Sequence, residues 1–206
     1  SIAVTTDDSN DEIVYASSMG DGVIQYKNGT PVQSYNEKNA FKETAGGYGS
    51  GYCYIDGLAF DKNGNLWMTS SEVNHAVLVL DKAGAWHRLD IEQLRGVYTI
   101  NDILITSTND KWIYVPRNTP KLVMIPNSES LDEVSSYEFT TLIDTDGKEL
   151  TPSNYTCVAE DKDGYIWVGT NRGAVYFTKP RISSAEDKAA TRCTRVKYTN
   201  EETGNL

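Results

Sequence analysis

The sequence predicts an all-β fold in which one sheet design occurs about four times. The 206 residues include 13 Tyr and 16 Gly, a composition typical of pleated strands joined by tight turns. Strand–turn–strand patterns return along the chain with a period of roughly 50 residues. Helical periodicity is weak, and we expect only loop or a turn of helix at Asp90–Leu94 and Ser184–Ala190.

The clearest copy of this design lies near the end of the chain. Three short strands are predicted there, at Thr156–Glu160, Tyr165–Gly169 and Ala174–Phe177. Asp161–Gly164 separates the first two and has the composition of a tight hairpin, since Gly accepts a positive φ. Asn171–Gly173 forms the second turn. The segment therefore reads as an antiparallel meander.

An earlier segment has the same order of strands and turns. Ile55–Phe60 is followed by the turn Asp61–Gly64, the strand Asn65–Thr69 around Trp67, and the strand Ala76–Leu80. Two further copies have weaker turns, at Asp7–Asp11 and Ser107–Asp110. Their strands are Ile2–Thr6, Ile13–Ser17 and Val23–Tyr26 in the first repeat, and Asp102–Thr106, Lys111–Val115 and Leu122–Ile125 in the third.

Each copy has room for a fourth, outer strand, which makes every repeat a four-stranded antiparallel sheet. We place the repeats at approximately residues 1–51, 52–97, 98–151 and 152–206, with Val14, Trp67, Trp112 and Trp167 at the centres of the second strands. The predicted outer strands are Thr30–Tyr35, Ala85–Leu89, Tyr137–Leu142 and Cys193–Tyr198.

Burial then decides how the sheets are arranged. Ile166 and Val168 point away from Trp167, as Leu66 and Met68 point away from Trp67, so each sheet has two apolar faces. Sheets packed radially against one another cover both faces, as in a β-propeller. The tryptophans are then packing residues between blades. Because rings of six to eight blades are the common size, we expect an arc of a larger propeller.

Composition excludes several function classes. The net charge of -10, from 29 acidic and 19 basic residues, argues against binding to nucleic acid or to an anionic membrane surface. No apolar run approaches the ~20 residues that cross a bilayer. Cys53, Cys157 and Cys193 lack metal or redox spacing, and their disulfide status stays open. The start at Ser1 leads us to expect an excerpt of a longer chain.

The motif of the fourth repeat resembles a known family. Glu160–Thr170, EDKDGYIWVGT, followed by Gly173, resembles the two-component regulator propeller repeat, in which a strand precedes D-x-x-G, an aliphatic residue, W-[IV]-G-T and Gly. Phe60–Thr69, FDKNGNLWMT, is similar. The other repeats depart from the motif, since Val14 replaces the Trp and Ser107–Asp110 lacks the turn Gly. The resemblance covers the whole chain in period and two stretches in motif.

The resemblance implies one of two settings. Such propellers form the sensor half of Bacteroidota hybrid histidine kinases, where they detect glycan fragments. They also form the PorZ-type protein of the type IX secretion attachment complex, which associates with a sortase and binds lipopolysaccharide. Both settings imply a periplasmic or outer-membrane surface location and no chemistry inside the propeller. Residues 64–89 and 111–125 look nearer to the second setting.

The sequence predicts no catalytic residue. His75 and His87 are the only histidines, and neither belongs to a G-x-S-x-G or HExxH motif. The hairpin carboxylates, such as Asp61 and Asp161, are expected to cap backbone N–H groups. A propeller-fold lyase or hydrolase stays an alternative, which would need carboxylates, His or Tyr clustered near the central channel.

We predict neither a metal nor a cofactor. Asp161–Gly164 and Asp144–Gly147 begin like calcium loops but lack the closing Glu, which favours simple turns. The Gly-rich segment 46–51 lacks the Lys-Ser/Thr of a phosphate-binding loop and is expected to connect two blades.

The candidate binding surface lies on the loops opposite the D-x-x-G hairpins. In a meander, the connection into the first strand and the second-to-third-strand loop emerge at one end of the blade. Aromatic rings, planar amides and guanidinium groups there suit sugar rings and their hydroxyl or carboxylate groups. The candidate residues are Tyr48, Tyr52, Asn74, His75, Arg117, Asn171 and Arg172.

The sequence thus predicts a noncatalytic module for glycan recognition or protein docking. Its partners would be a glycan or lipopolysaccharide, proteins of a cell-envelope complex, or neighbouring domains of the same chain. The PorZ-like role is the first alternative, and the propeller-fold enzyme is the second.

Overall fold

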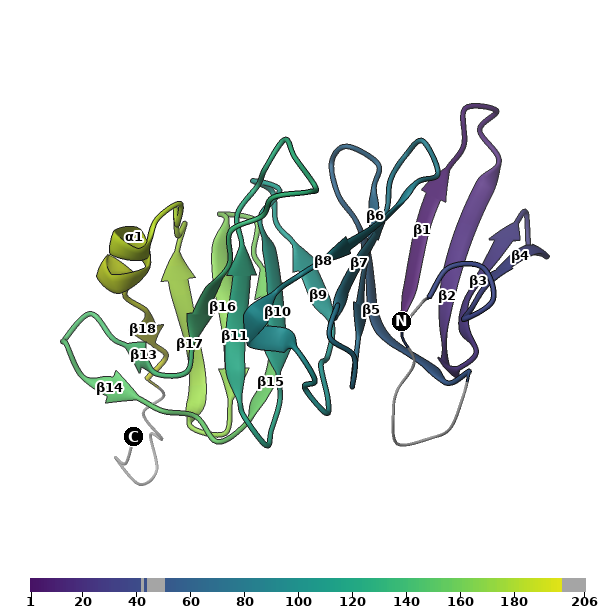
Figure 1. The fold of residues 1–206 in the computed structure, drawn as a ribbon. Helices are drawn as coiled ribbons and strands as arrows, with labels where there is room; N and C mark the ends of the chain where they lie inside the picture. The colour runs from purple at the N-terminus through teal and green to yellow at the C-terminus, as the bar shows by residue number, and fades with distance from the viewer. Residues whose placement is uncertain (42, 44–50, 198–206) are drawn as a thin grey trace, which may run out of the picture.

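The computed structural model of the chain describes residues 1–41, 43 and 51–197. Four antiparallel blades stand side by side along the described part of the chain (Figure 1), which confirms the all-β propeller-like fold. None of the helices in these ranges is long and apolar enough to cross a membrane.

The first two blades follow the predicted meanders within one or two residues at most strand ends. Their strands are β1 (Ile2–Thr6), β2 (Glu12–Gly20), β3 (Gly22–Lys27), β4 (Thr30–Tyr35), β5 (Cys53–Phe60), β6 (Leu66–Ser70), β7 (Val77–Leu80) and β8 (Trp86–Leu89). The end of β2 pairs with the start of β5, at Met19 with Tyr54 and Gly20 with Cys53, so the two blades share one continuous sheet.

The third and fourth blades repeat the design, with one additional hairpin between them. Their strands are β9 (Ile103–Ile105), β10 (Lys111–Val115), β11 (Lys121–Ile125), β12 (Tyr137–Phe139), β15 (Tyr155–Glu160), β16 (Tyr165–Thr170), β17 (Gly173–Thr178) and β18 (Thr194–Arg195), and the hairpin is β13 (Leu142–Ile143) with β14 (Glu149–Leu150). The expected turns of helix are η1 (Glu92–Leu94) and α1 (Ala185–Ala190).

The predicted outer strand Tyr137–Leu142 is wrong at its end. The strand β12 stops at Phe139, because Leu142 pairs with Leu150 in the additional hairpin around the Asp144–Gly147 turn. The backbone N–H of Cys193 donates to the carbonyl of Ile143 and fastens this hairpin to the fourth blade. The predicted strand Cys193–Tyr198 forms only at Thr194–Arg195, and Tyr198 lies outside the described residues.

Three apolar clusters fill the spaces between consecutive blades. Leu66 and Met68 pack toward the first blade, whereas Trp67 packs toward the third. Trp112 lies between the third and fourth blades, against Phe139 and Phe177. Trp67 and Trp112 are each 1% exposed, which confirms their role as packing residues. Alternate residues of one strand thus belong to different cores.

A buried lysine contributes to the interface between the second and third blades. Lys111 of β10 is 2% exposed, and its Nζ lies 4.4 Å from the centre of the Trp67 ring in the neighbouring blade. Burial lowers the pKa of Lys111, and the attraction of Asp61 and Asp110 opposes that effect. The ammonium therefore gains a cation–π contact where it loses water.

The outward faces of the first and last blades are partly uncovered. Ile2 and Val4 of β1 are 67% and 57% exposed, whereas Ala3 between them is buried. At the other end, Trp167 and Tyr176 pack on each other with ring centroids 4.9 Å apart and are half-buried. The two end blades stand at opposite sides of the molecule (Figure 1), so the blades form an arc.

One hydrogen-bond pattern shapes the D-x-x-G hairpins. The Asp61 carboxylate accepts the backbone N–H groups of Asn63 and Asn65 and the indole N–H of Trp67, the last at 2.9 Å. Asp161 repeats this pattern with Trp167, at 2.7 Å from the indole nitrogen. Bonds from the indole and the backbone lower the pKa of Asp161. The motif aspartate thus fixes both the turn and the tryptophan.

The first repeat keeps the turn and loses the tryptophan. The Asp7 N–H bonds to the carbonyl of Asp11, as the Asp61 N–H bonds to that of Asn65. This register puts Ile13, six residues after Asp7, at the tryptophan position. The sequence assignment of Val14 to that position is therefore wrong by one residue, because turn geometry sets the register.

The third repeat keeps the turn with different residues. Thr106 accepts the backbone N–H of Asp110 through its hydroxyl, which replaces the aspartate. Asn109 has φ 67° and replaces the turn glycine. Asn tolerates this left-handed conformation better than most residues.

We expect Asp61→Ala to lower the free energy of unfolding by about 2 kcal/mol, because a capping acceptor is lost and the buried indole N–H of Trp67 is left unpaired. Urea denaturation measures this change. Asp8→Ala, at an exposed position of the first hairpin, is the control and should change stability by less than about 0.5 kcal/mol. Equal effects of the two changes would contradict the role of Asp61.

We also expect Trp112→Ala to cost about 3–5 kcal/mol and Trp167→Ala less than about 2 kcal/mol. The two residues are equivalent in the repeat, but only Trp112 is enclosed by two blades. Parallel urea titrations compare them. Equal losses would show that the outer face of the fourth blade is covered in solution.

Candidate functional site

The blades have two ends with different loops. We call the end with the β1–β2, β5–β6, β9–β10 and β15–β16 turns the hairpin face, and the opposite end the loop face. The β1–β2 turn is at the top of Figure 1. The predicted binding residues belong to the loop face.

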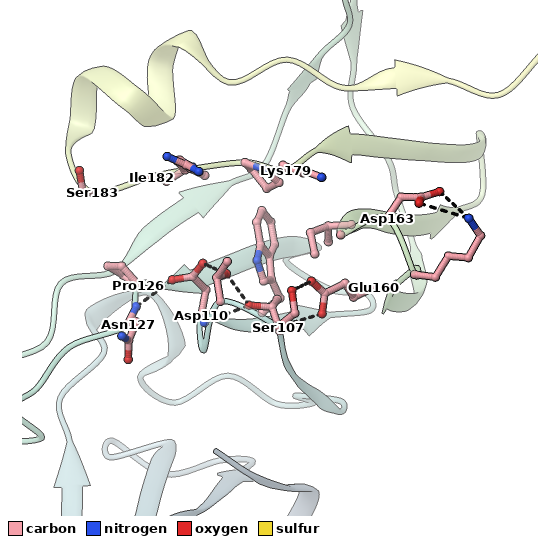
Figure 2. A pocket seen from close by; sticks show the side chains of 17 residues that line it. Ser107, Asp110, Pro126, Asn127, Glu160, Asp163, Lys179, Ile182 and Ser183 are labelled. Carbon is pink, nitrogen blue, oxygen red and sulfur yellow. Dashed lines mark hydrogen bonds and ion pairs between the residues drawn. The ribbon is translucent and has the colours of Figure 1, made fainter. Parts of the chain in front are cut away.

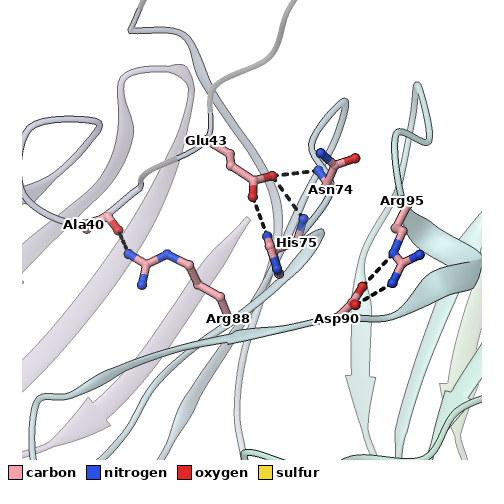
Figure 3. Close-up of polar contacts among 7 residues, drawn as sticks. All are labelled: Ala40, Glu43, Asn74, His75, Arg88, Asp90 and Arg95. Atoms are coloured by element: carbon pink, nitrogen blue, oxygen red, sulfur yellow. Dashed lines mark hydrogen bonds and ion pairs between the residues drawn. The ribbon is translucent and has the colours of Figure 1, made fainter.

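On the loop face, Asn74 and His75 are held by one carboxylate (Figure 3). Glu43 accepts the backbone N–H groups of both residues, at 2.7 and 3.1 Å, and its other oxygen contacts Nδ1 of His75. Burial acts to raise the pKa of Glu43, but the hydrogen bonds from His75 and Asn74 outweigh it and lower that pKa. His75 is therefore engaged in a contact within the chain.

Of the two predicted tyrosines, Tyr52 belongs to the described residues. Tyr48 lies outside the described residues. Tyr52 packs edge-on against Tyr54, with ring centroids 6.3 Å apart, and lies close over Gly20. A Cβ at Gly20 would approach the Tyr52 ring to 2.9 Å, so this ring covers the end of β2.

Backbone hydrogen bonds connect the loops that carry Arg117, Asn171 and Arg172. The Tyr155 N–H donates to the carbonyl of Pro116, and the Asn171 N–H donates to that of Asn154. The Asn171 side chain accepts two further backbone N–H groups through its oxygen and donates one N–H to Ser153, so most of its amide capacity is used within the chain.

Arg117 and Arg172 are exposed and differ from other arginines near the loops. Arg95 forms a bidentate pair with Asp90, and Arg88 donates to the carbonyl of Ala40 (Figure 3). Within the described ranges, the side chains of Arg117 and Arg172 make no ion pair or hydrogen bond. These two guanidinium groups are the accessible charges of the predicted site.

The hairpin face has a cleft that the sequence reasoning missed. It lies between the third and fourth blades, has a volume of about 630 Å³, and falls in the range of small-molecule pockets. Figure 2 shows its wall of Asp110, Pro126 and Asn127 facing the segment from Lys179 to Ser183. Its floor includes Trp112, Ile166 and Ile182.

Neighbouring hairpins are tied together beside this cleft. The carboxylate of Glu160 accepts both the backbone N–H and the hydroxyl of Ser107, each at 2.5 Å, and so joins the third and fourth blades. The backbone N–H of Lys62 donates to Asn109 and joins the second blade to the third. The contact of Glu160 with Ser107 therefore links the two walls of the cleft, and the bond from Lys62 to Asn109 links the hairpins beside it.

One carboxyl group on an inner strand is strongly perturbed. Burial raises the pKa of Asp56 on β5 to about 7, while a 2.6 Å hydrogen bond from Ser71 and the N-terminal amine oppose the shift. The Ser71 hydroxyl in turn accepts the Ile100 N–H. The described residues bring no group of three His, Cys, Asp or Glu side chains together as a metal site.

The four blades, their shared cores and the two loop-bearing ends define a β-propeller segment. Residues 149–172, which include the fourth hairpin and Trp167, match the family model described as Two component regulator propeller. The match falls on the stretch whose motif carried the predicted resemblance. No curated protein matches the chain in sequence.

Solved structures share the fold at low sequence identity. PorZ of Porphyromonas gingivalis, an essential surface component of the type-IX secretion system, aligns with a TM-score of 0.79 and 18% identity over 95% of this chain and 26% of PorZ. The extracellular domain of the hybrid two component system BT4673 from B. thetaiotaomicron aligns at 0.62 and 15% over 97% of this chain and 24% of that domain.

An enzyme also shares the fold. The gluconolactonase of Xanthomonas campestris aligns with a TM-score of 0.52 and 11% identity, over 93% of this chain and 60% of the enzyme. This chain spans about a quarter of the PorZ and BT4673 chains. At these identities, the comparisons show the propeller fold.

We expect the stability of the chain to fall by about 1–3 kcal/mol between pH 5 and pH 8, through Asp56. Its pKa of about 7 exceeds that of an unfolded aspartate, so the folded state holds the extra proton, and one pKa unit corresponds to about 1.4 kcal/mol. Urea titrations at several pH values measure this fall. Asp56→Asn should flatten it, and an unchanged slope in the variant would contradict the assignment.

Proposed function

We propose that the chain is part of a noncatalytic, extracytoplasmic β-propeller module that recognises a ligand or docks a protein at its loop face. The observation that carries the proposal is the pair of free guanidinium groups, Arg117 and Arg172, on loops of neighbouring blades. Guanidinium groups bind carboxylates and phosphates in bidentate geometry. An anionic group of a glycan or of a partner protein is therefore the preferred ligand.

The rigidity of the supporting loops favours recognition. Asn171 bonds to the segment at Ser153 and Asn154 through both its backbone and its side chain, and Pro116 accepts a bond from Tyr155. Preorganised loops reduce the entropy lost on binding. The blade interfaces hold these loops in position, because each blade shares its core with its neighbours.

A PorZ-like role is the second form of the proposal. It is supported by the higher TM-score of PorZ, 0.79, compared with 0.62 for the BT4673 domain. In this role the chain serves an envelope secretion complex as a docking platform with lipopolysaccharide and protein partners. The location is then the periplasm or the outer-membrane surface, as the resemblance implies.

The noncatalytic reading is supported by how the candidate acid and base groups are used. His75 contacts Glu43, and His87 lies 3.0 Å from Asp81. The hairpin aspartates accept backbone and indole N–H groups. Turnover of any member of a polysaccharide panel would overturn this part of the proposal in favour of a propeller-fold lyase or hydrolase.

We expect Arg117→Ala combined with Arg172→Ala to weaken binding of an anionic glycan or of lipopolysaccharide at least tenfold, since charge-assisted hydrogen bonds contribute about 1.5–3 kcal/mol each. Glycan-array screening followed by calorimetry with the strongest hit measures the affinity. Arg95→Ala is the matched control, because Arg95 is exposed but already paired with Asp90. Unchanged affinity in the double variant would remove the loop face from the proposal.

A further inference from the structure

We propose that the cleft between the third and fourth blades on the hairpin face is a second binding site, which takes a small organic anion with an apolar ring. This site is distinct from the loop face at the other end of the blades. Trp112, Lys179 and Arg181 supply its free hydrogen-bond donors, and apolar side chains supply its floor.

The third repeat lacks the hydrogen bond that holds the indole N–H in the second and fourth repeats. In the second and fourth repeats, Asp61 and Asp161 accept the indole N–H of the tryptophan six residues later. In the third repeat, Thr106 occupies the aspartate position, and its hydroxyl bonds to Thr108 and to the Asp110 N–H. Among the residues that the structure describes, the indole N–H of Trp112 has no acceptor.

The lost hydrogen bond leaves an unpaired donor at the cleft. As a whole residue Trp112 is 1% exposed; it lines the cleft and is held by ring contacts with Phe139 and Phe177. An indole nitrogen donates and does not accept. The buried side-chain nitrogen and oxygen atoms without a partner in the described ranges do not include this nitrogen, so it is reached from the cleft, and an acceptor atom of a ligand there can take its hydrogen bond.

Most charged side chains around the cleft have partners within the chain, but two cations do not. Lys162 pairs with Asp163, Glu160 accepts from Ser107, and Asp110 accepts from Asn127 and Thr108. Lys179 and Arg181 make no side-chain ion pair or hydrogen bond within the described ranges. Two unpaired cations that line the same cleft as an unpaired indole N–H favour an oxyanion such as carboxylate, sulfate or phosphate.

The charges also limit the affinity. Three acidic side chains, Asp110, Glu160 and Asp163, balance the three cations that line the cleft. The charges of the lining therefore cancel. An anion is attracted by the donors that it touches and only weakly by the overall electrostatic field of the cleft. We expect dissociation constants between about 10 μM and 1 mM for a single-ring ligand.

The floor of the cleft is apolar, and the cleft is large enough for a ring. Ile166 and Ile182 are buried, and Pro126 and Pro180 line the cleft beside them. A bare inorganic ion would leave these surfaces wet, whereas a ring would cover them. The volume of about 630 Å³ accommodates one or two rings.

The equivalent cleft between the first two blades gives an internal comparison. It has a volume of about 570 Å³, but Ile13 replaces the tryptophan, so no indole donor is present. Its Lys27 is paired with both Asp7 and Asp11. Lys62 donates to Ser107, which leaves Lys82 as a cation of this cleft, so the combination of an indole donor with two unpaired cations is absent from it in the described ranges.

The test uses the ¹⁵N-labelled chain and naphthalene-2-sulfonate as probe, with 2-naphthol as the neutral comparison. We expect a saturable shift of the Trp112 indole cross-peak, and at least tenfold weaker binding of 2-naphthol. An indole cross-peak of Trp112 that does not respond, or equal affinity for the two probes, would overturn the proposal.

Thr106→Asp is the decisive variant. It restores the aspartate of the other tryptophan repeats, which should take the indole N–H and add a negative charge, so that probe binding falls at least tenfold while the fold is kept. Thr106→Asn, which adds no charge, should retain more of the binding. Wild-type affinity in a folded Thr106→Asp chain would refute the site.

A second pair of variants separates this site from the loop face. Lys179→Ala with Arg181→Ala should weaken the probe at least tenfold and leave the loop-face ligand unaffected. Arg117→Ala with Arg172→Ala should leave the probe unaffected. Loss of probe binding in the Arg117 and Arg172 variant alone would move the anion to the loop face and overturn the cleft, whereas the reverse pattern supports it.

Discussion

The need to bury both faces of every sheet determines this structure. Alternate residues along β6 belong to different cores, with Leu66 and Met68 facing the first blade and Trp67 facing the third. A blade of this kind cannot keep both faces dry alone. Neighbouring blades therefore pack closely, and their interfaces hold the loops at both ends in fixed relative positions. The proposed recognition would use these loops, which stand on packed cores.

The hairpin hydrogen bond connects this packing to the candidate chemistry. An aspartate that caps the turn also fixes the tryptophan that fills the interface, as Asp61 does for Trp67. Where Thr106 takes its place, the turn survives, because its hydroxyl still accepts the Asp110 N–H. The tryptophan also stays packed, but its indole N–H becomes available to the cleft. A single substitution in a repeat motif can thus change a structural donor into a binding donor.

Much of the architecture could be predicted from periodicity, because turn residues and alternating apolar residues recur in every repeat. The register of the first repeat could not, since Val14 and Ile13 are both apolar and only the backbone bonds of the Asp7 turn distinguish them. The additional β13–β14 hairpin was also missed as a pairing, although its Asp144–Gly147 turn was recognised. Strand pairing depends on contacts between segments distant in the chain, which local patterns do not encode.

The candidate sites were harder to predict than the fold. Arg117 and Arg172 could be proposed as exposed loop residues, but the engagement of Asn171 with Ser153 depends on a contact across two loops. The cleft at Trp112 requires a comparison of equivalent positions, and the departure of Thr106 from the motif was its only signal in the sequence. A comparison of Thr106 with Asp61 and Asp161, the equivalent residues of the other two repeats, would have indicated the cleft.

The two uncovered end faces give the arc a direction. Aliphatic side chains, including Ile2 and Val4, form one end, whereas the aromatic pair of Trp167 and Tyr176 forms the other. The two ends therefore present different packing surfaces, with branched aliphatic groups at one end and flat rings at the other. A sheet packed on the first blade is thus expected to fit between branched aliphatic groups, whereas one packed on the fourth blade is expected to lie against aromatic rings.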